Sequence, residues 1–465
     1  MLLPLRSLHD DLHTAEADGI HERQRDLAWG YLAEASRAAA EYKEISCESE
    51  GGKFIKAVLL ETAAYPSPVH HPEYDKSFDS HPSWGSPAAR VDAAHGVIRL
   101  GRHATCTDAA LLETIRRLAM DEVPAVRYQI VTNLNSLYYT APELMWELLE
   151  RMSREDESRG VLQGMLVGSL NSLAAYHPDR VTDCVRSIFE RVRDGDGAIE
   201  VRKHCASIFV GLYLWQKQPV CGEIVGKMVE DPVTYSTEAN QIVFDIRNWL
   251  NIGPIEPPNP EQDAVRTASF KLLERLLEAV RDNLGTLMEK NAAADFLSWS
   301  DEDRERAKKL ADVAEHVCMH VYFFSGAYKN SSDDRAEKIS LGVPGRTRFL
   351  RESRRVLELL SDFGYPRLTH HLLQMLEYLV AFDPQEVFLL VGRVVRSGKQ
   401  GGYQYEPMAA DLVVRLVERF IAEFRHILQE NEECRRTLIE ILDTFVEAGW
   451  PSARRLTYRM EDVFR

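Results

Sequence analysis

The chain has 465 residues, of which 45% are hydrophobic and 28% charged, a composition typical of a folded globular protein. Its formal net charge of −16 disfavours bulk binding to nucleic acid or to an anionic membrane, because both require a concentrated positive surface. The length allows roughly two to four ordinary domains or one extended repeat array.

The cysteines are dispersed along the chain and never form a Cys-x-x-Cys pair. This pattern predicts buried free thiols in a reducing compartment, and therefore a cytoplasmic protein. The start of the chain lacks the features of a secretory signal. The longest uncharged stretch, residues 160–178, holds too many polar side chains for a membrane span, so we expect no membrane contact. The seven cysteines are Cys47, Cys106, Cys184, Cys205, Cys221, Cys318 and Cys434.

The first part of the chain is expected to hold helices followed by a long loop. Apolar residues at helical spacing predict helices over residues 21–42 and about 54–63. Residues 65–86 then contain four prolines and three histidines, and a loop this long is unusual in a compact domain. Either a functional insertion or a surface loop without a function would explain it.

Histidines and carboxylates gather in this loop and could provide metal ligands or catalytic groups. An irregular loop fixes no geometry for them, so the sequence leaves this possibility open. The residues concerned are His70, His71, His81, Asp75 and Asp79.

A repeat of about 40 residues follows the loop. Each copy has an arginine that opens an apolar helix, and the step is clearest as Pro-x-x-Arg at Pro87–Arg90 and Pro124–Arg127. Apolar residues follow each arginine at offsets that lie on one helical face. A partner helix is expected between successive steps, starting near residues 107, 140, 177 and 218. The four arginines are Arg90, Arg127, Arg159 and Arg202.

The stretch Asp121-Glu-Val-Pro-Ala-Val-Arg127 resembles the inter-helix signature of HEAT repeats, and Arg90 and Arg202 match that signature in part. The resemblance covers residues 86–250. It implies stacked helical hairpins that present a long surface to partners. In that family the arginine and the preceding acid tie one repeat to the next, which implies a structural role for Arg90, Asp121, Arg127 and Arg202.

The second half of the chain is predicted to continue as helices. Prolines at residues 254, 257, 258 and 260 exclude a helix interior, so residues 251–262 are expected to form a connection. Polar loops are expected at residues 329–346 and 397–407. The predicted helices are 263–291, 301–328, 349–363, 369–382, 384–396, 408–431, 433–448 and 452–464.

These patterns together predict an all-α fold, a HEAT-like solenoid of helical hairpins with a less regular helical C-terminal half. The expected domains are N-terminal helices with the loop, HEAT-like repeats, the proline-rich connection and a C-terminal hairpin region. Their boundaries are 1–85, 86–250, 251–262 and 263–465.

The densest basic patch lies at the predicted start of a helix and is a candidate partner-binding site. It could hold phosphate, RNA or an acidic protein surface. Alternatively, it could be a solvated face that pairs with the chain's own carboxylates. The patch consists of Arg346, Arg348, Arg351, Arg354 and Arg355.

One predicted helix carries a possible metal-binding row. Asp312, His316 and His320 are spaced four apart and could face one ion, whereas Cys318 points elsewhere. The alternative is a polar stripe beside a core face. The sequence contains none of the common nucleotide-binding, hydrolase or zinc-protease motifs. No catalytic residue, metal or cofactor is therefore predicted.

These observations favour a non-catalytic protein-interaction scaffold or sensor. Residues 438–465 resemble the C-terminal end of large bacterial multidomain proteins that carry an NTPase or nuclease, some of them linked to phage defence. This resemblance implies a protein partner, such as an NTPase or nuclease subunit, within an antiviral system. The alternatives are a nucleic-acid-binding solenoid that uses Arg346–Arg355 and a metal-dependent enzyme that uses the histidine clusters.

Overall fold

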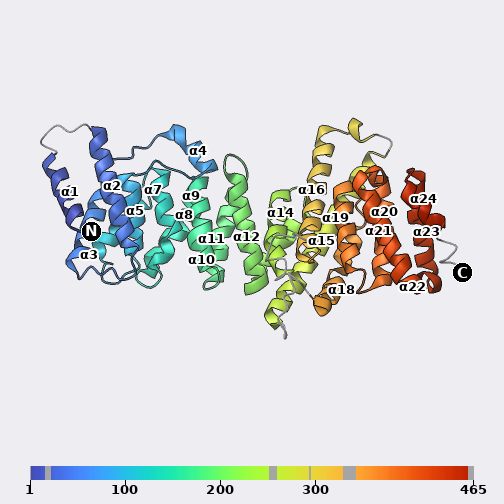
Figure 1. The fold of residues 1–465 in the computed structure, drawn as a ribbon. Coiled ribbons are helices and arrows are strands. Elements are labelled where there is room, and N and C mark those ends of the chain that lie inside the picture. The colour runs from blue at the N-terminus through green and yellow to red at the C-terminus, as the bar shows by residue number, and fades with distance from the viewer. Residues whose placement is uncertain (1, 16–21, 251–258, 293–294, 328–341, 459–465) are drawn as a thin grey trace. The chain divides into compact units, whose positions relative to one another are not determined.

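The computed structural model describes residues 2–15, 22–250, 259–292, 295–327 and 342–458. All regular structure in these segments is helical, which confirms the predicted all-α fold class (Figure 1). The chain divides into two compact units, Met1–Gly222 and Glu223–Arg465, and the division falls within α13 (Pro219–Glu230). No helix in the described segments is both long enough and apolar enough to cross a lipid bilayer.

The first unit is a two-layer stack of helical hairpins, as the HEAT resemblance implies. The helices of one layer contact one another in chain order and are α2 (Glu22–Ala40), α5 (Ala89–Leu100), α7 (Pro124–Thr132), α9 (Arg159–Met165) and α12 (Ala198–Gln216). The other layer holds α3 (Glu50–Thr62), α6 (Ala109–Leu118), α8 (Pro142–Glu155) and α11 (Pro178–Arg191), and α1 (Leu2–Ala15) lies against α2. Short helical turns complete the unit: η1 (Pro72–Tyr74), α4 (Asp75–Ser80), η2 (Leu134–Leu137), η3 (Leu166–Leu170) and α10 (Asn171–Leu173).

Local sequence explains where these helices start. Prolines occupy the first helical position of α7, α8 and α11, where a missing N–H costs nothing. The Asp108 side chain caps α6 by accepting a hydrogen bond from Leu111 N at 3.0 Å. Glycines then allow α7 and α9 to approach closely, since a Cβ on Gly164 would stand 2.5 Å from the Tyr128 ring.

The predicted long loop at residues 65–86 is wrong in part, because the segment contains η1 and α4. It crosses the ends of α7 and α9, and α4 contacts both helices (Figure 1). The Phe78 side chain is buried there, only 7% exposed, beside the Tyr128 ring. The closely spaced prolines predicted a loop, but the short helix α4 forms because its apolar residue Phe78 packs against the repeats.

The prediction of seven free thiols is also wrong. Cys47 and Cys106 form a disulfide with a Cα–Cα distance of 4.9 Å, whereas the other five cysteines are free and buried. The two residues are 59 positions apart in sequence, and packing of α3 beside the turn after α5 brings them together. The Lys56 ammonium reinforces this contact by donating to Cys106 O at 2.8 Å.

Thiol counting tests the disulfide. Protein purified without reductant and then denatured should react with a thiol reagent at the five free cysteines, and at all seven after reduction. The Cys47→Ser variant should give six without reduction, the five plus the released Cys106. Seven reactive thiols in the unreduced, air-exposed wild type would contradict the bond.

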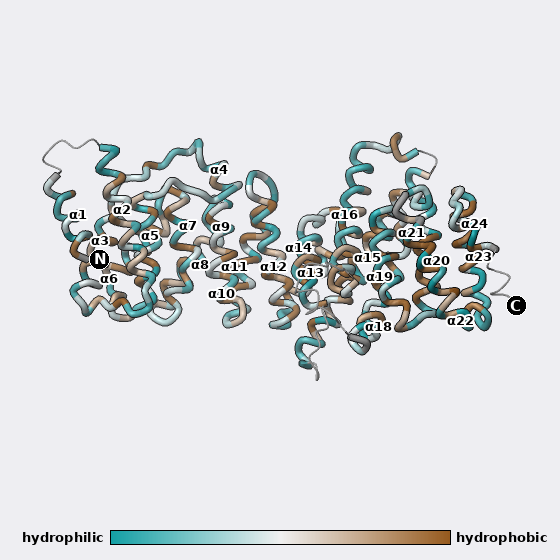
Figure 2. The backbone as a smooth tube through the Cα atoms, viewed as in Figure 1, coloured by the Kyte–Doolittle hydropathy of each residue, from teal (hydrophilic) through white to brown (hydrophobic). Residues whose placement is uncertain are grey.

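The second unit is also built from paired helices in two layers. One layer holds α15 (Pro260–Lys290), α18 (Gly342–Leu360), α20 (Pro384–Gln400) and α23 (Glu432–Glu447). The other holds α14 (Ser236–Ile246), α16 (Asp301–Phe324), α19 (Pro366–Leu379), α21 (Pro407–Glu423) and α24 (Pro451–Tyr458). Shorter turns are η4 (Arg247–Trp249), η5 (Phe296–Ser298), η6 (Tyr403–Tyr405) and α22 (Arg425–Glu430). Hydrophobic and hydrophilic stretches alternate along the helices of each unit (Figure 2), as amphipathic packing requires.

Several boundaries in this unit differ from the prediction, and the expected helix 408–431 is broken at Phe424 into α21 and α22. Helix α15 begins at Pro260, inside the expected connection, because proline is tolerated at the first helical position. Helix α18 begins at Gly342, inside the expected loop 329–346, whose residues 329–341 lie outside the described part. Within the expected loop 397–407, α20 instead extends to Gln400 and η6 follows it, because Tyr403 is buried against the helices. Residues 251–258 of the proline-rich connection and 459–465 of the C-terminal stretch also lie outside the described part.

Candidate interaction surfaces

The repeat arginines connect successive hairpins of the first unit. Arg90 Nε lies 3.1 Å from Asp121 Oδ2, and Arg127 Nε lies 2.8 Å from Asp156 Oδ2. Each acid also accepts a backbone hydrogen bond at the next helix start, from Val123 N to Asp121 Oδ1 and from Ser158 N to Asp156 Oδ1, both 2.9 Å. Each pair therefore ties one repeat to the next, and Asp156 is a member that the sequence motif did not identify.

The last two repeat arginines also reach backbone carbonyls. Arg159 Nη2 donates to Asp194 O at 2.7 Å, and Arg202 Nη1 donates to Val192 O at 3.1 Å. The Arg202 guanidinium also lies over the Phe189 ring, 4.4 Å from its centroid. These contacts keep the structural character of the step.

The segment of residues 65–86 is held against the repeats by polar contacts. Arg90 donates to the carbonyls of Tyr65, Pro66 and Pro68 at 3.2, 3.1 and 2.8 Å. At the other end, Asp79 Oδ1 accepts from Ser158 Oγ at 2.7 Å. The segment is thus part of the folded body.

The histidines of this segment do not converge on a common centre. His70 Nε2 lies 3.1 Å from Asp75 Oδ2, and His71 Nδ1 lies 3.3 Å from Glu73 Oε1, so each has its own carboxylate partner. No metal-ligand cluster in the described part of the chain includes these residues or His81. Asp79 caps α9 instead of joining them.

Most of the predicted basic patch is occupied by partners within the second unit. Arg348 Nη2 lies 2.9 Å from Asp263 Oδ1, and its Nε lies 2.9 Å from Glu352 Oε1. Arg355 Nη2 lies 2.8 Å from Glu278 Oε1. These acids come from α15 and from α18 itself, so the charge is largely balanced.

The remaining patch residues divide into bound and exposed ones. Arg354 Nε lies 2.6 Å from Glu386 Oε1, and the Arg346 guanidinium lies over the Tyr378 ring at 4.3 Å. Arg351 is exposed and has no ion pair within the described segments. Within the described segments, Arg346 and Arg351 are thus the two patch arginines without an acidic partner, which is a weak basis for binding a polyanion.

The histidine row of α16 does not form a metal centre in the described structure. His316 Nδ1 is hydrogen-bonded to Asn240 Oδ1 of α14 at 2.7 Å, and His320 lies at the edge of the Phe244 ring. Cys318 is buried on another face and donates to Leu368 O. The row is thus the polar stripe that the sequence left as the alternative.

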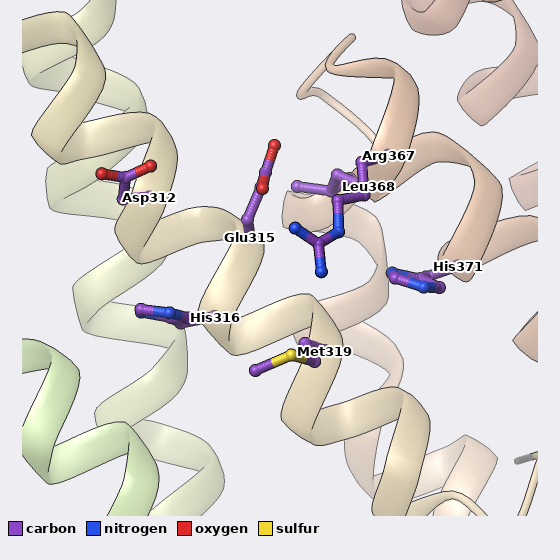
Figure 3. A pocket seen from close by; sticks show the side chains of 7 residues that line it. All are labelled: Asp312, Glu315, His316, Met319, Arg367, Leu368 and His371. Atoms are coloured by element: carbon purple, nitrogen blue, oxygen red, sulfur yellow. The ribbon is translucent and has the colours of Figure 1, made fainter.

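A shallow pocket of about 150 Å³ lies between α16 and α19 (Figure 3). Asp312, Glu315 and His316 line it from α16, and Arg367 and His371 line it from α19. Figure 3 shows the Arg367 guanidinium turned toward α16 beside Glu315, with His316 directed away to the other side. The small volume and mixed charge suit a few water molecules, since drug-sized ligands need roughly 300 Å³ or more.

His320 should make folding sensitive to acid. Burial, and then the charges of Arg247 and His316, lower the pKa of His320 from 6.5 to about 4. Between these values the unfolded chain binds a proton that the folded chain does not, so stability falls as pH falls from about 6.5 toward 4. Melting temperatures at about pH 7.5 and pH 5 should therefore differ less in His320→Gln than in the wild type. An unchanged difference would mean that other groups carry the acid sensitivity.

A feature that the motif search missed is a group of aromatic side chains on the turns between repeat helices. This turn cluster consists of Tyr138, Tyr139, Tyr176 and His177, from the turns before α8 and α11. Ring centroids of Tyr138 lie 4.8 Å from Tyr139 and 6.3 Å from Tyr176, and His177 Nε2 is 3.0 Å from Tyr138 Oη. Tyr139 is 91% exposed and Tyr176 73% exposed. In the sequence, aromatic residues recur shortly before Pro142 and Pro178, and this recurrence could have predicted the cluster.

Arginine and tryptophan extend the turn cluster. The Arg180 guanidinium lies 4.2 Å from the centroid of the Trp146 ring, which in turn lies 5.3 Å from His177. Trp146 is buried, 4% exposed, so this end of the cluster is fixed by the core. The result is a mostly uncharged aromatic surface on the turns of the repeats, which the buried Trp146 anchors at one end.

No protein-family model matches the chain, and no curated protein matches it in sequence. Solved structures with a similar arrangement include Kap121p bound to Ste12p, at 10% identity and a TM-score of 0.34, covering 96% of this chain and 49% of that one. A complex of SYS-1 with POP-1 is 10% identical with a TM-score of 0.20, covering 95% and 99%. The chain spans about half the length of the Kap121p chains that it matches. TM-scores this low establish neither shared ancestry nor a shared activity.

Proposed function

We propose that this chain is a non-catalytic protein-interaction module and that its partner docks on the turn cluster. The observation that carries the proposal is the exposure of Tyr139 and Tyr176 on a cluster that the core holds in place. A rigid exposed tyrosine loses little conformational entropy on binding and offers both an apolar ring and a hydroxyl.

The composition of this surface supports a protein ligand over a nucleic acid. Tyrosine, tryptophan and arginine are the residues that dominate binding energy at protein interfaces. The nearby Arg180 is already paired with Glu150 at 2.5 Å, and the net charge of the chain is −16. A nucleic-acid surface would need several unpaired cations beside the rings.

Affinity purification from the native host at mild salt tests this proposal. The wild-type chain should recover a stoichiometric protein partner, and Tyr139→Ala/Tyr176→Ala should recover at least about tenfold less of it, because a hot-spot side chain contributes about 2 kcal/mol. The matched control is Tyr42→Ala/Tyr405→Ala, which removes two tyrosines of similar exposure, 66% and 72%, that are not members of the cluster.

The outcome separates the candidate functions. Equal recovery of the partner by all three proteins would reject the turn cluster as the docking surface. Recovery of the chain with nucleic acid, lost steeply as salt rises, would favour the nucleic-acid-binding solenoid and the exposed Arg351. Unchanged circular dichroism of the variants excludes unfolding as the cause of any loss.

The proposal extends to the wider system. The resemblance of residues 438–465 to the end of bacterial multidomain proteins supports a cytoplasmic partner that carries the catalytic activity, an NTPase or nuclease subunit of an antiviral system. Mass spectrometry of the recovered partner tests this part separately. A partner without an NTPase or nuclease domain would reject the antiviral assignment while leaving the interaction module intact.

A further inference from the structure

Three metal-ligating side chains converge where α1 packs beside α3. His9 and His13 are four residues apart on α1, so their rings share one face of the helix. Glu61 comes from α3, 52 residues later than His9. In the described part of the chain, this is the one group of three or more such residues whose ligand atoms all lie within 4.8 Å of one another.

The separations between the ligand atoms suit a common cation. His9 Nε2 lies 2.8 Å from Glu61 Oε2, His13 Nε2 lies 2.9 Å from Glu61 Oε1, and the two Nε2 atoms are 3.3 Å apart. Ligands at about 2.0–2.2 Å from a zinc ion stand roughly 3–3.5 Å from one another. The two imidazole nitrogens and one Glu61 oxygen therefore need only small side-chain shifts to surround an ion.

The surroundings fix the two rings. The edges of Trp29 and Phe54 pack against the His9 ring at centroid distances of 6.1 and 5.7 Å, and Trp29 also lies 5.5 Å from the His13 ring. The Trp29 side chain is buried, 3% exposed. His13 and Glu61 remain 46% and 39% exposed, so an ion can enter from solvent.

We propose that His9, His13 and Glu61 form a binding site for a divalent transition-metal ion of the zinc class. Two imidazole nitrogens and one carboxylate oxygen favour zinc over magnesium or calcium, which prefer oxygen ligands. Three protein ligands leave a fourth position for water.

The ion would join α1 to the body of the first unit. Among the α1 side chains whose burial the structure describes, only Leu5 and Leu12 are buried, at 9% and 5% exposure, so this helix has a small apolar contact. An ion that bridges α1 and α3 stabilises the folded form, and more so the more tightly it binds, because the unfolded chain does not bring the ligands together.

Titration of metal-free protein with Zn²⁺ and Co²⁺ tests the site. The wild type should bind one equivalent of Co²⁺ with visible d–d absorption, Zn²⁺ should displace it, and the melting temperature should rise with Zn²⁺. His13→Gln and Glu61→Gln should each weaken binding by about a hundredfold or more, since a lost ligand costs at least as much as a lost supporting residue. Both replaced side chains are part-exposed, so folding should survive, as circular dichroism would show.

His71→Gln is the matched control. His71 also lies beside a carboxylate, Glu73, but has no third ligand, and its loss should leave the affinity unchanged. The proposal is overturned if the wild type binds no stoichiometric Zn²⁺. It is also overturned if both ligand variants still bind Zn²⁺ as tightly as the wild type, or if the control variant loses Zn²⁺ binding to the same extent as they do.

Discussion

Replacement of Arg127 by alanine is expected to destabilise the first unit by about 3–5 kcal/mol, the usual cost of removing one partner of a buried ion pair. Asp156 is only 5% exposed, and its two oxygens accept from Arg127 Nε and Nη2 at 2.8 and 3.1 Å. Arg127 Nη1 also donates to Asp121 O at 2.7 Å. The alanine substitution therefore leaves hydrogen-bond acceptors of two consecutive repeat steps without their donor. Urea or thermal unfolding followed by circular dichroism measures the loss.

Arg116→Ala is the control for this prediction. Arg116 also pairs with an acid of a neighbouring helix, Glu147 at 2.9 Å, but the two side chains are 43% and 50% exposed. Exposed pairs contribute about 0–1 kcal/mol because water and salt screen them. If Arg127→Ala costs no more than Arg116→Ala, the buried pairs do not hold the repeats together.

Replacement of Phe78 by alanine is expected to release the segment of residues 65–86 from the repeats. Removing a buried phenylalanine costs about 3–5 kcal/mol of stability, and here it weakens the packing of α4 against α9. The Phe78 ring lies 6.0 Å from the Tyr128 ring and close against Gly160, where a Cβ would stand 2.7 Å from Phe78 Cδ1. Limited proteolysis should therefore cut within the segment at least about a hundredfold faster.

Tyr74→Ala is the matched control, since Tyr74 lies in the same segment but is 66% exposed. Its cleavage rate should stay near that of the wild type. The rest of the first unit should keep its helical circular dichroism in Phe78→Ala under the conditions of the proteolysis, because the segment opens locally. Cooperative unfolding of the whole unit in Phe78→Ala would instead show that α4 is an integral part of the repeat core.

The sequence predicted local structure well because helical periodicity is a local property. The Pro-x-x-Arg steps at Arg90 and Arg127 mark helices α5 and α7, and prolines start several others. Errors came where a short polar stretch gained structure from burial. The side chains of Phe78 and Tyr403 are both buried, so helical turns form in segments whose composition predicted loops.

Charge pairing could not be predicted in the same way. The arginines at residues 346–355 form a basic patch in sequence, yet Asp263, Glu278 and Glu386 balance most of it from other helices. Those acids are 32 to 85 residues away from their partners in the sequence, and no spacing rule connects them. The charge of a surface depends on which helices become neighbours.

The sequence by itself determined that the chain is helical, that its first half repeats, and that arginines open the repeats. Only the tertiary structure decided that Cys47 meets Cys106, that Asp156 receives Arg127, and that Glu61 meets His9 and His13. The physical reason is the range of the interactions. Periodicity and capping act within one or two helical turns, whereas these contacts depend on the packing of helices that are distant in sequence.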